Sequence, residues 1–269
     1  MKHLLRIAIG LAIVAYLGAA AYMTAFQRSF LYRTAPEWQE PADHNLPQAS
    51  RQILTTPDGI MLSGWWIAPK RDDAPVFLYF HGNANGLSRR ALRFSIMSAD
   101  GSGVLAMSYR GYGGSGGAPT EMALHADALL AYRHLAQQFA PERIVIFGES
   151  LGSGVALNLA RQVKTKAVVL DSPYLSIVEQ ARLSYPWLPV SRLLIDQFRS
   201  DLFIRQVDEP VLILHGTADT LIPPVQSERL AASGNPALVT RKLYEGQPHV
   251  VRYNQGPDAD VRAWLSQIR

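Results

Sequence analysis

The sequence contains no cysteine. Disulfide bonds and thiolate metal sites are therefore excluded, and the chain can fold in a reducing or an oxidising compartment alike. Glycine (20 residues) and proline (17 residues) are ordinary in number and spread along the chain, and there is no internal repeat or low-complexity segment. Hydrophobic residues make up 48% of the 269 residues. We therefore expect one large folded domain with an appendage, and not a disordered protein.

Strong charge is also lacking, because the formal net charge at pH 7 is only +4. The basic residues are scattered, apart from small pairs such as Arg89-Arg90, and no basic stripe with interleaved aromatic residues is present. Such a stripe is typical of nucleic-acid binding, so no nucleic-acid partner is predicted. Proximity to anionic lipid is the more economical explanation of a mildly basic surface.

A charge-free and largely apolar stretch runs from Ile7 to Gln27. At 1.5 Å per residue, about 20 helical residues span the roughly 30 Å hydrocarbon core of a bilayer. Lys2 and Arg6 precede the stretch, and Arg28 and Arg33 follow it. The sequence thus predicts an N-terminal transmembrane helix within residues 1–27, with a membrane as a partner.

A cleaved signal peptide is the alternative, because Ala19-Ala20-Ala21 offers a small-residue cleavage site. The apolar run exceeds the roughly 7–15 residues of a signal-peptide core and continues past that site, which favours a retained single-pass anchor. Charges on the two sides nearly balance, so the positive-inside rule gives only a slight bias. The expected orientation places the N-terminus in the cytoplasm and the folded domain on the outer, periplasmic or extracytoplasmic side.

The remainder of the chain reads as an arm followed by a β/α domain. Three prolines punctuate a polar stretch, so residues 28–50 are predicted to be a linker or wrapping arm. Two apolar runs around Pro57-Asp58-Gly59 predict an antiparallel hairpin at the start of the domain, residues 51–269. Beyond residue 75, strand-like and helix-like runs alternate. This order predicts an α/β fold with a mostly parallel eight-stranded sheet and helices on both faces. The predicted strands are 52–56, 60–67, 76–80, 103–107, 143–147, 167–170, 211–214 and 238–243, and the predicted helices are 87–99, 120–139, 151–163, 223–233 and 258–268.

The pentapeptide Gly148-Glu149-Ser150-Leu151-Gly152 lies between the predicted strand 143–147 and the predicted helix 151–163. A strand, a sharp turn and a helix form the setting in which the serine of a G-x-S-x-G motif becomes a nucleophile. A turn that tight strains the backbone of the serine and brings strand and helix together, so Gly148 and Gly152 must carry no side chain. Ser150 is therefore the candidate nucleophile.

A second pentapeptide, Gly113-Gly114-Ser115-Gly116-Gly117, fits the same pattern. It lies in a run of glycines, and Pro119 delays any following helix. A flexible glycine loop cannot hold a serine in one strained conformation, so Ser115 is interpreted as a loop residue.

Further motifs stand in a specific order around Ser150. His81-Gly82-Asn83 follows an earlier strand, Asp219 follows a later one, and His249 lies near the end of the chain. Strand-end placement and the chain order Ser…Asp…His resemble the α/β-hydrolase fold superfamily. Phe80-His81-Gly82-Asn83-Ala84, Tyr109-Arg110-Gly111-Tyr112-Gly113-Gly114-Ser115-Gly116 and the anchor end Phe30-Leu31-Tyr32-Arg33 are more closely similar to its membrane-anchored, bud-emergence-protein-like branch. The resemblance covers essentially the whole chain.

This resemblance implies a Ser-His-Asp triad. A serine hydroxyl is a poor nucleophile at neutral pH and needs a base, for which His249 is the candidate. The base needs a buried carboxylate that holds its tautomer, and Asp219 matches the usual position. Asp171 is a competitor, because it directly follows the strand 167–170 and some members of the fold place the acid there. Activity is then expected to rise with pH through about 6–7, where a histidine base loses its proton.

The other histidines fit a catalytic role less well. His81 and His215 each precede a glycine at a strand end and are interpreted as supports of the local turn. His125 and His134 lie on the predicted helix 120–139, at its surface or at the edge of the core.

The resemblance also implies an oxyanion hole and a cap. The two donors would be the backbone N–H groups of Leu151, at a helix N-terminus, and of Asn83. Residues 172–206 interrupt the β/α alternation, and in this family such an insertion builds a cap over the active site. Its aromatic residues could line an acyl or leaving-group pocket, or they could pack the cap on the body.

The sequence thus predicts a membrane-anchored serine hydrolase of carboxylic esters or thioesters, acting on a small-molecule or lipid-like acyl substrate. No metal or organic cofactor is implied. Cleavage of amides by an aminopeptidase-like enzyme with the same triad is one alternative. A non-catalytic binding protein with this fold is another, although the intact Ser, Asp and His in order count against it. A dehalogenase is disfavoured, since it would carry a carboxylate at position 150.

Overall fold

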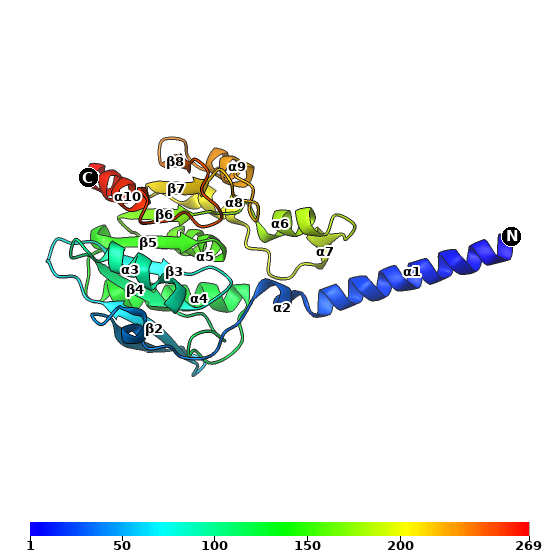
Figure 1. The fold of residues 1–269 in the computed structure, drawn as a ribbon, viewed down its shortest axis with the longest axis horizontal. Coiled ribbons are helices and arrows are strands. Elements are labelled where there is room, and N and C mark those ends of the chain that lie inside the picture. Colours follow the sequence, from blue (N-terminus) through cyan, green and yellow to red (C-terminus); the bar gives the residue numbers. More distant parts are fainter. Residues whose placement is uncertain (269) are drawn as a thin grey trace.

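The computed structural model describes residues 1–268 and is built around one mixed sheet (Figure 1). The strand order is β1-β2-β4-β3-β5-β6-β7-β8; β2 is antiparallel to its two neighbours, and all pairs from β4 to β8 are parallel. The predicted α/β-hydrolase fold with eight strands is confirmed. The strands are β1 Ser50–Thr55, β2 Met61–Ile67, β3 Val76–Phe80, β4 Gly103–Met107, β5 Ile144–Glu149, β6 Ala167–Asp171, β7 Val211–Gly216 and β8 Val239–Tyr244.

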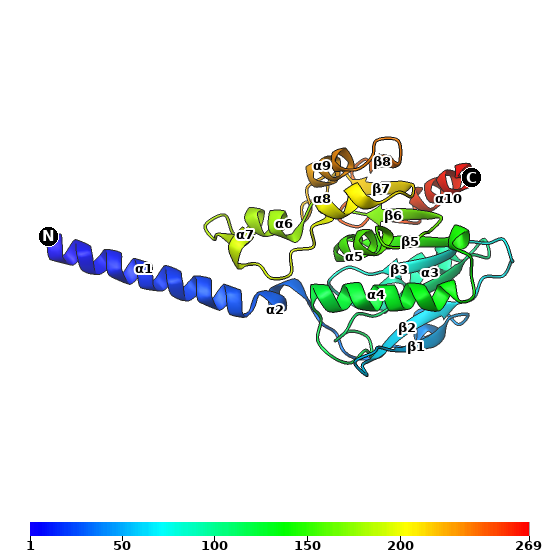
Figure 2. The same cartoon turned by 180° about the vertical axis from the view of Figure 1, so that it is seen from behind.

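Helices cover both faces of the sheet, which explains why β3 to β7 are buried along their whole length (Figure 2). One apolar core contains side chains from α4 Glu121–Ala136, α5 Leu151–Ala160 and α9 Val225–Ser233. The other contains side chains from α3 Ala91–Met97 and α10 Pro257–Gln267. The helix predicted over 87–99 is split into a 3-10 turn, η2 Leu87–Arg90, and α3. A further 3-10 turn, η3 Pro141–Arg143, leads into β5.

The N-terminal helix α1 (Lys2–Ala25) projects away from the body of the molecule (Figure 1). None of its residues is buried, and an 18-residue stretch within it has a mean hydropathy of 2.1, so the helix is long and apolar enough to cross a membrane. A short helix, α2 (Gln27–Leu31), joins it to the body. By length and composition, α1 is a candidate membrane span.

The segment that follows α2 packs against the body. Tyr32 and Leu46 are buried, the N–H of Gly113 donates to the carbonyl of Ala35, and the N–H of Gly114 donates to that of Pro36. A 3-10 turn, η1 Pro41–His44, lies within this arm. The arm is therefore extended along the body, and its backbone carbonyls accept hydrogen bonds from the glycine-rich loop, residues 113–117.

The insertion between β6 and β7 contains α6 Ile177–Ser184, α7 Val190–Leu193, α8 Ser200–Phe203 and η4 Ile204–Gln206. Only α6, α7 and their connection extend outward, on the same side as α1 (Figures 1 and 2). The later part packs back on the body, where Phe198 and Ile204 are buried. The carboxylate of Glu121, at the start of α4, accepts the N–H groups of Gln197 and Phe198 at 2.6 and 3.0 Å, which ends the projecting part.

Candidate active site

Ser150 occupies a tight turn between β5 and α5, with φ 50° and ψ −115°. A Cβ atom on Gly148 would lie 2.5 Å from the carbonyl oxygen of Gly152. A Cβ atom on Gly152 would lie 2.1 Å from the carbonyl oxygen of Phe80 in β3. Both contacts are impossible for a real side chain, so the two glycines allow the close packing that holds the serine in its strained conformation.

Ser150, His249 and Asp219 meet at the carboxyl ends of the strands. The Oγ of Ser150 lies 3.0 Å from Nε2 of His249, and Nδ1 of His249 lies 2.7 Å from Oδ2 of Asp219. The three residues come from the β5–α5 turn, the loop after β7 and the loop after β8. The serine hydroxyl can therefore donate to an imidazole whose other nitrogen donates to a carboxylate, which is the geometry of an activated nucleophile.

Asp219 is buried and accepts several hydrogen bonds. Its Oδ1 accepts the N–H groups of Leu221 and Ile222, both at 2.9 Å, and its Oδ2 contacts both His249 and His215. Burial opposes ionisation, but the hydrogen bonds from His215, His249 and the backbone outweigh it and hold the pKa of Asp219 below its ordinary value. The carboxylate is thus ionised and fixed in place.

His215 contributes more than the support of a turn. Its Nε2 lies 2.9 Å from the carbonyl oxygen of Ile222 and 3.1 Å from Oδ2 of Asp219. Because a carbonyl oxygen only accepts, Nε2 carries the hydrogen and can share it with Asp219. The interpretation from sequence missed this contact; the spacing of four residues between His215 and Asp219 at a strand end was the available signal.

Asp171, the competing carboxylate, is directed elsewhere. It forms an ion pair with Arg93 at 2.7 Å, and it accepts the hydroxyl of Ser172 and the N–H of Val251. Burial raises the pKa of Asp171, although the charge of Arg93 opposes this. Its contacts hold the loop that carries His249, and the imidazole itself faces Asp219.

Ser115 and His81 have structural contacts. The hydroxyl of Ser115 donates to the carbonyl of Ser108 and accepts the N–H of Ser63, both at 2.9 Å. Nδ1 of His81 donates to the carbonyl of Gly82, and Nε2 accepts the N–H of Tyr109. Burial is the main cause that lowers the pKa of His81 to about 3, so its imidazole is neutral.

Asn83 and Leu151 border the same cavity as Ser150. The side-chain amide of Asn83 donates to the carbonyl of Leu31, and its backbone carbonyl accepts the hydroxyl of Tyr112 and the N–H of Arg33. These bonds fix the loop from both sides. Leu151 is the first residue of α5, where backbone N–H groups lack an intrahelical acceptor. The role of the two N–H groups as oxyanion donors stays a prediction.

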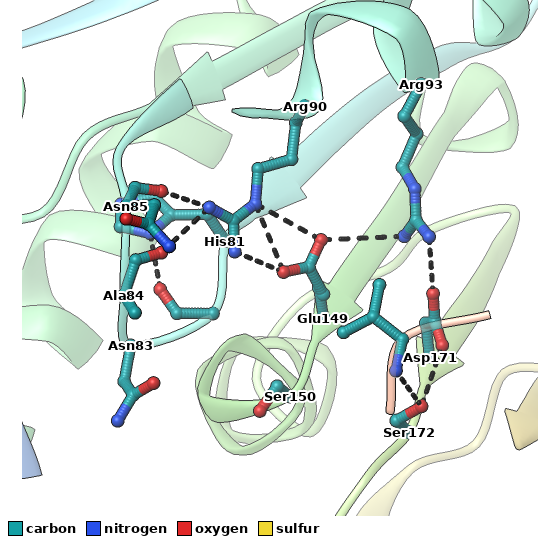
Figure 3. A network of polar contacts seen from close by, with 12 residues as sticks. His81, Asn83, Ala84, Asn85, Arg90, Arg93, Glu149, Ser150, Asp171 and Ser172 are labelled. Carbon is teal, nitrogen blue, oxygen red and sulfur yellow. Dashed lines mark hydrogen bonds and ion pairs between the residues drawn. The ribbon is translucent and has the colours of Figure 1, made fainter. Parts of the chain in front are cut away.

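A buried ion-pair network lies directly behind Ser150 (Figure 3). Arg90 donates to Glu149 through Nη2 at 2.5 Å and Nε at 3.1 Å, and its Nη1 donates to the carbonyls of Ala84 and Gly86. Burial opposes ionisation of Glu149, but the charges of Arg90 and Arg93 outweigh it and lower the carboxyl pKa. Arg90 thus connects the residue before the serine with the loop that begins at Asn83, a role that the sequence pair Arg89-Arg90 did not reveal.

Arg93 extends this network to the loop of His249. Its guanidinium lies 3.6 Å from Glu149 and 2.7 Å from Asp171, and it donates to the carbonyl of Val251. Val250, next to His249, has φ 62°, an unfavourable value for a β-branched residue. The Ser172 hydroxyl, which accepts the N–H of Val250 at 3.0 Å, holds this strained backbone.

A cavity of about 270 Å³ opens above Ser150. One wall comes from the end of α1 and from α2, and the opposite wall comes from α6 and α7. Most of its lining is apolar, for example Met23, Phe30, Tyr185 and Leu188, and among the described residues Arg33 is the one charged side chain that lines it. Within residues 1–268, no group of three or more His, Asp or Glu side chains is placed to hold a metal ion.

Comparison with known proteins gives consistent matches. The family described as "Serine aminopeptidase, S33" matches residues 72–204. The uncharacterized protein Rv2307c of Mycobacterium tuberculosis is 38% identical over 255 residues, which are 94% of this chain and 89% of that protein. The protein bem46 of Schizosaccharomyces pombe is 30% identical over 224 residues, 77% and 75% of the two chains. The lysophosphatidylserine lipase ABHD12 of Danio rerio is 32% identical over 224 residues, 69% of this chain but 58% of the lipase.

Two solved structures support the fold. An α/β-hydrolase from Vibrio vulnificus superposes with a TM-score of 0.73 at 22% identity and covers 90% of this chain and 93% of its own. The esterase PF2001 of Pyrococcus furiosus superposes with a TM-score of 0.67 at 20% identity, with 88% and 97% covered. At such identities the likeness concerns the fold alone.

Proposed function

The chain belongs to the bem46-like branch of the α/β-hydrolase serine hydrolases, and we propose that it cleaves carboxylic esters or thioesters of lipid-like substrates while anchored to a membrane by α1. The observation that carries this proposal is the pair of contacts at His249, 3.0 Å to the Ser150 hydroxyl and 2.7 Å to Asp219. The proposed division is an anchor over 1–27, an arm over 28–50 and a hydrolase domain over 51–269 with its cap, on the outer side of the membrane.

The proposed reaction has two halves. Ser150 attacks the substrate carbonyl while His249 takes its proton, and the backbone N–H groups of Asn83 and Leu151 stabilise the oxyanion. His249 then protonates the leaving oxygen or sulfur, which leaves an acyl group on Ser150. Water attacks this acyl-enzyme with His249 again as base, and Asp219 stabilises the imidazolium each time it forms.

The cavity supports a lipid-like substrate. Its apolar walls suit an acyl chain, and the ABHD12 relative is named a lysophosphatidylserine lipase. The family description favours an aminopeptidase as the second candidate. A carboxylate near the substrate ammonium would favour an aminopeptidase, whereas among the described residues Arg33 is the charged residue that lines this cavity. Ester or thioester cleavage is therefore the better-supported reaction.

Labelling with a fluorophosphonate probe, which reacts with activated serines, tests the proposal. The detergent-solubilised wild type is compared with Ser150→Ala and with Ser115→Ala, its matched control. We expect labelling to disappear in Ser150→Ala alone, after which acyl esters, thioesters and amides can be compared as substrates. A well-folded wild type that resists the probe would instead favour a binding protein with this fold.

A further inference from the structure

The outer end of the cap lies beside the middle of α1. We call residues 183–191, which join α6 to α7, the cap tip. The hydroxyl of Tyr16 donates to the backbone carbonyl of Trp187 at 3.3 Å, and the two aromatic rings meet edge to face with centroids 6.1 Å apart. Both views of the molecule show α6 and α7 extending along the side from which α1 projects (Figures 1 and 2).

This contact has a consequence for any orientation in which α1 crosses a bilayer. Tyr16 lies 11 residues before Gln27, where the charge-free stretch ends. That separation corresponds to about 17 Å along a helix, which is about half of a hydrocarbon core of roughly 30 Å. A cap tip that contacts Tyr16 therefore lies at the depth of the nearer leaflet, beyond the headgroups.

The side chains of the cap tip suit that depth. Residues 183–191 carry no charge, and Leu183 and Trp187 are 57% and 49% exposed although they are large and apolar. In water such exposure is costly, whereas acyl chains would cover both side chains. The charged residues Arg182 and Arg192 stand at the two ends of the tip, where long side chains can reach the headgroups.

Part of the backbone of the cap tip also suits an apolar medium, in which polar groups need internal partners. Pro186 and Pro189 have no N–H to satisfy. The N–H groups of Tyr185, Leu188 and Val190 donate to carbonyls within residues 181–188. The carbonyl of Trp187 is satisfied by the anchor itself, through Tyr16.

The base of the cap is held to the anchor at the level where the apolar stretch ends. Arg28 forms an ion pair with Asp196 at 2.9 Å, and the Tyr32 hydroxyl donates to the same carboxylate. The side chain of Gln27 bonds the backbone of Leu193 and Ile195. These polar contacts fix the angle between cap and anchor, and the cavity above Ser150 lies between the two.

We propose that the cap tip inserts into the leaflet nearest the hydrolase domain, and that the cavity takes the acyl chain of its substrate from that leaflet, between α1 and the cap. The partner of this surface is the lipid bilayer. The entry route rests on the proposed hydrolysis, whereas the insertion of the cap tip rests on the proposed anchoring by α1 and not on catalysis.

The absence of cysteine allows a direct test of insertion. Single cysteines replace Trp187, Leu183, Leu11 in α1 and Ser266 in α10, which lies at the opposite end of the molecule (Figure 1). Each full-length variant is labelled with an environment-sensitive fluorophore and reconstituted in phosphatidylcholine vesicles that contain doxyl-labelled acyl chains. We expect quenching of the labels at 187 and 183 to approach that at 11, and the label at 266 to remain unquenched. Labels at 187 and 183 that behave like the label at 266 overturn the insertion.

Kinetics test the entry route. Trp187→Ser and Leu183→Ser are compared with Ile53→Ser, which changes an exposed apolar residue of β1. We expect the two cap-tip variants to lose roughly tenfold in kcat/KM for a long-chain lysophospholipid held in vesicles, mainly through KM, and to keep wild-type hydrolysis of a short water-soluble ester. Equal losses on both substrates, or none on either, contradict the route. A wild type without fluorophosphonate labelling contradicts the proposed function, and the entry route with it, while the quenching result still decides insertion.

Discussion

Residues 113–117 and residues 148–152 share the G-x-S-x-G pattern but have different neighbours. The hydroxyl of Ser115 is enclosed by the backbone of Ser108 and Ser63. The hydroxyl of Ser150 faces an imidazole and borders the cavity. The pattern alone therefore does not make a nucleophile; a base within hydrogen-bond distance and space for a substrate are also needed.

The glycines of the two pentapeptides also have different structural roles. In the first, Gly113, Gly114 and Gly117 have φ values of 45°, 80° and 73°, which glycine adopts without strain. In the second, the positive φ falls on Ser150 itself, and the glycines provide close contacts between chain segments. The backbone of the first loop is therefore unstrained, because glycine occupies each position with a positive φ. In the second loop, close packing around the glycines holds Ser150 in a strained backbone conformation.

The largest effect is expected from removing the charge behind the imidazole. Asp219→Asn should lower kcat for ester hydrolysis by about 10⁴-fold with little change in fold, because the imidazole loses its tautomer and its counter-charge. Asp171→Asn is the matched control, since Asp171 ends the neighbouring strand and does not contact His249. Its activity per folded molecule should stay within about tenfold of wild type. Equal losses in the two variants would reassign the acid.

Replacing a glycine by alanine should destabilise the two pentapeptides to different extents. In Gly152→Ala the new Cβ would meet the Phe80 carbonyl at 2.1 Å, so the free energy of unfolding should fall by more than about 4 kcal/mol. In Gly117→Ala the nearest atoms lie at 3.5 Å or more, and only the unfavourable φ costs about 1–2 kcal/mol. Denaturant unfolding measures both values, and similar losses would mean that close packing does not hold the turn of Ser150.

The third comparison is between Arg90, near residues 148–152, and Arg110, near residues 113–117. Arg90→Gln should lower the free energy of unfolding by about 3 kcal/mol, because it leaves the buried carboxylate of Glu149 short of a partner. It should also slow fluorophosphonate labelling of the folded fraction, since the loop of Asn83 loses its tie to Glu149. Arg110→Gln removes ion pairs with Asp58 and Asp127 near the glycine loop and should affect stability alone. Unchanged labelling in Arg90→Gln would limit that residue to a structural role.

The last prediction concerns the pH dependence of stability and His81, whose ring contacts Tyr109 and Tyr112. Its pKa is about 3 when folded and about 6.5 in an unfolded chain, so protons bind the unfolded state preferentially between these values. The stability that its neutral form contributes is complete above about pH 6.5 and is lost as pH falls toward 3, with a slope of at most about 1.4 kcal/mol per pH unit. Urea unfolding of wild type and His81→Gln, with His134→Gln as control, measures this slope. A slope that persists unchanged in His81→Gln would assign it to other groups.

Much of the fold follows from local patterns. Apolar runs, helical periodicity and the hairpin signal each depend on neighbouring residues, so the eight strands, the two covered faces and the turn at Ser150 were predictable. The order of motifs along the chain, together with the family resemblance, predicted Ser150, His249 and Asp219, with Asp171 left as a competitor for the acid. The sequence by itself thus determined the architecture and the chemical character of the site.

The tertiary structure decided which of several equivalent residues meet. Asp171 ends β6 and Asp219 lies in the loop after β7, at the same edge of the sheet, and only the position of Arg93 shows that Asp171 is already paired. The tie between Arg90 and Glu149 joins residues 59 apart, and the contact of Tyr16 with Trp187 joins residues 171 apart. Such pairings depend on how loops cross in space, for which local periodicity carries no information. The sequence therefore determined the candidate nucleophile Ser150 and its strand. The packing of distant loops decided which carboxylate faces His249, what supports the turn of Ser150, and that α1 forms a wall of the cavity.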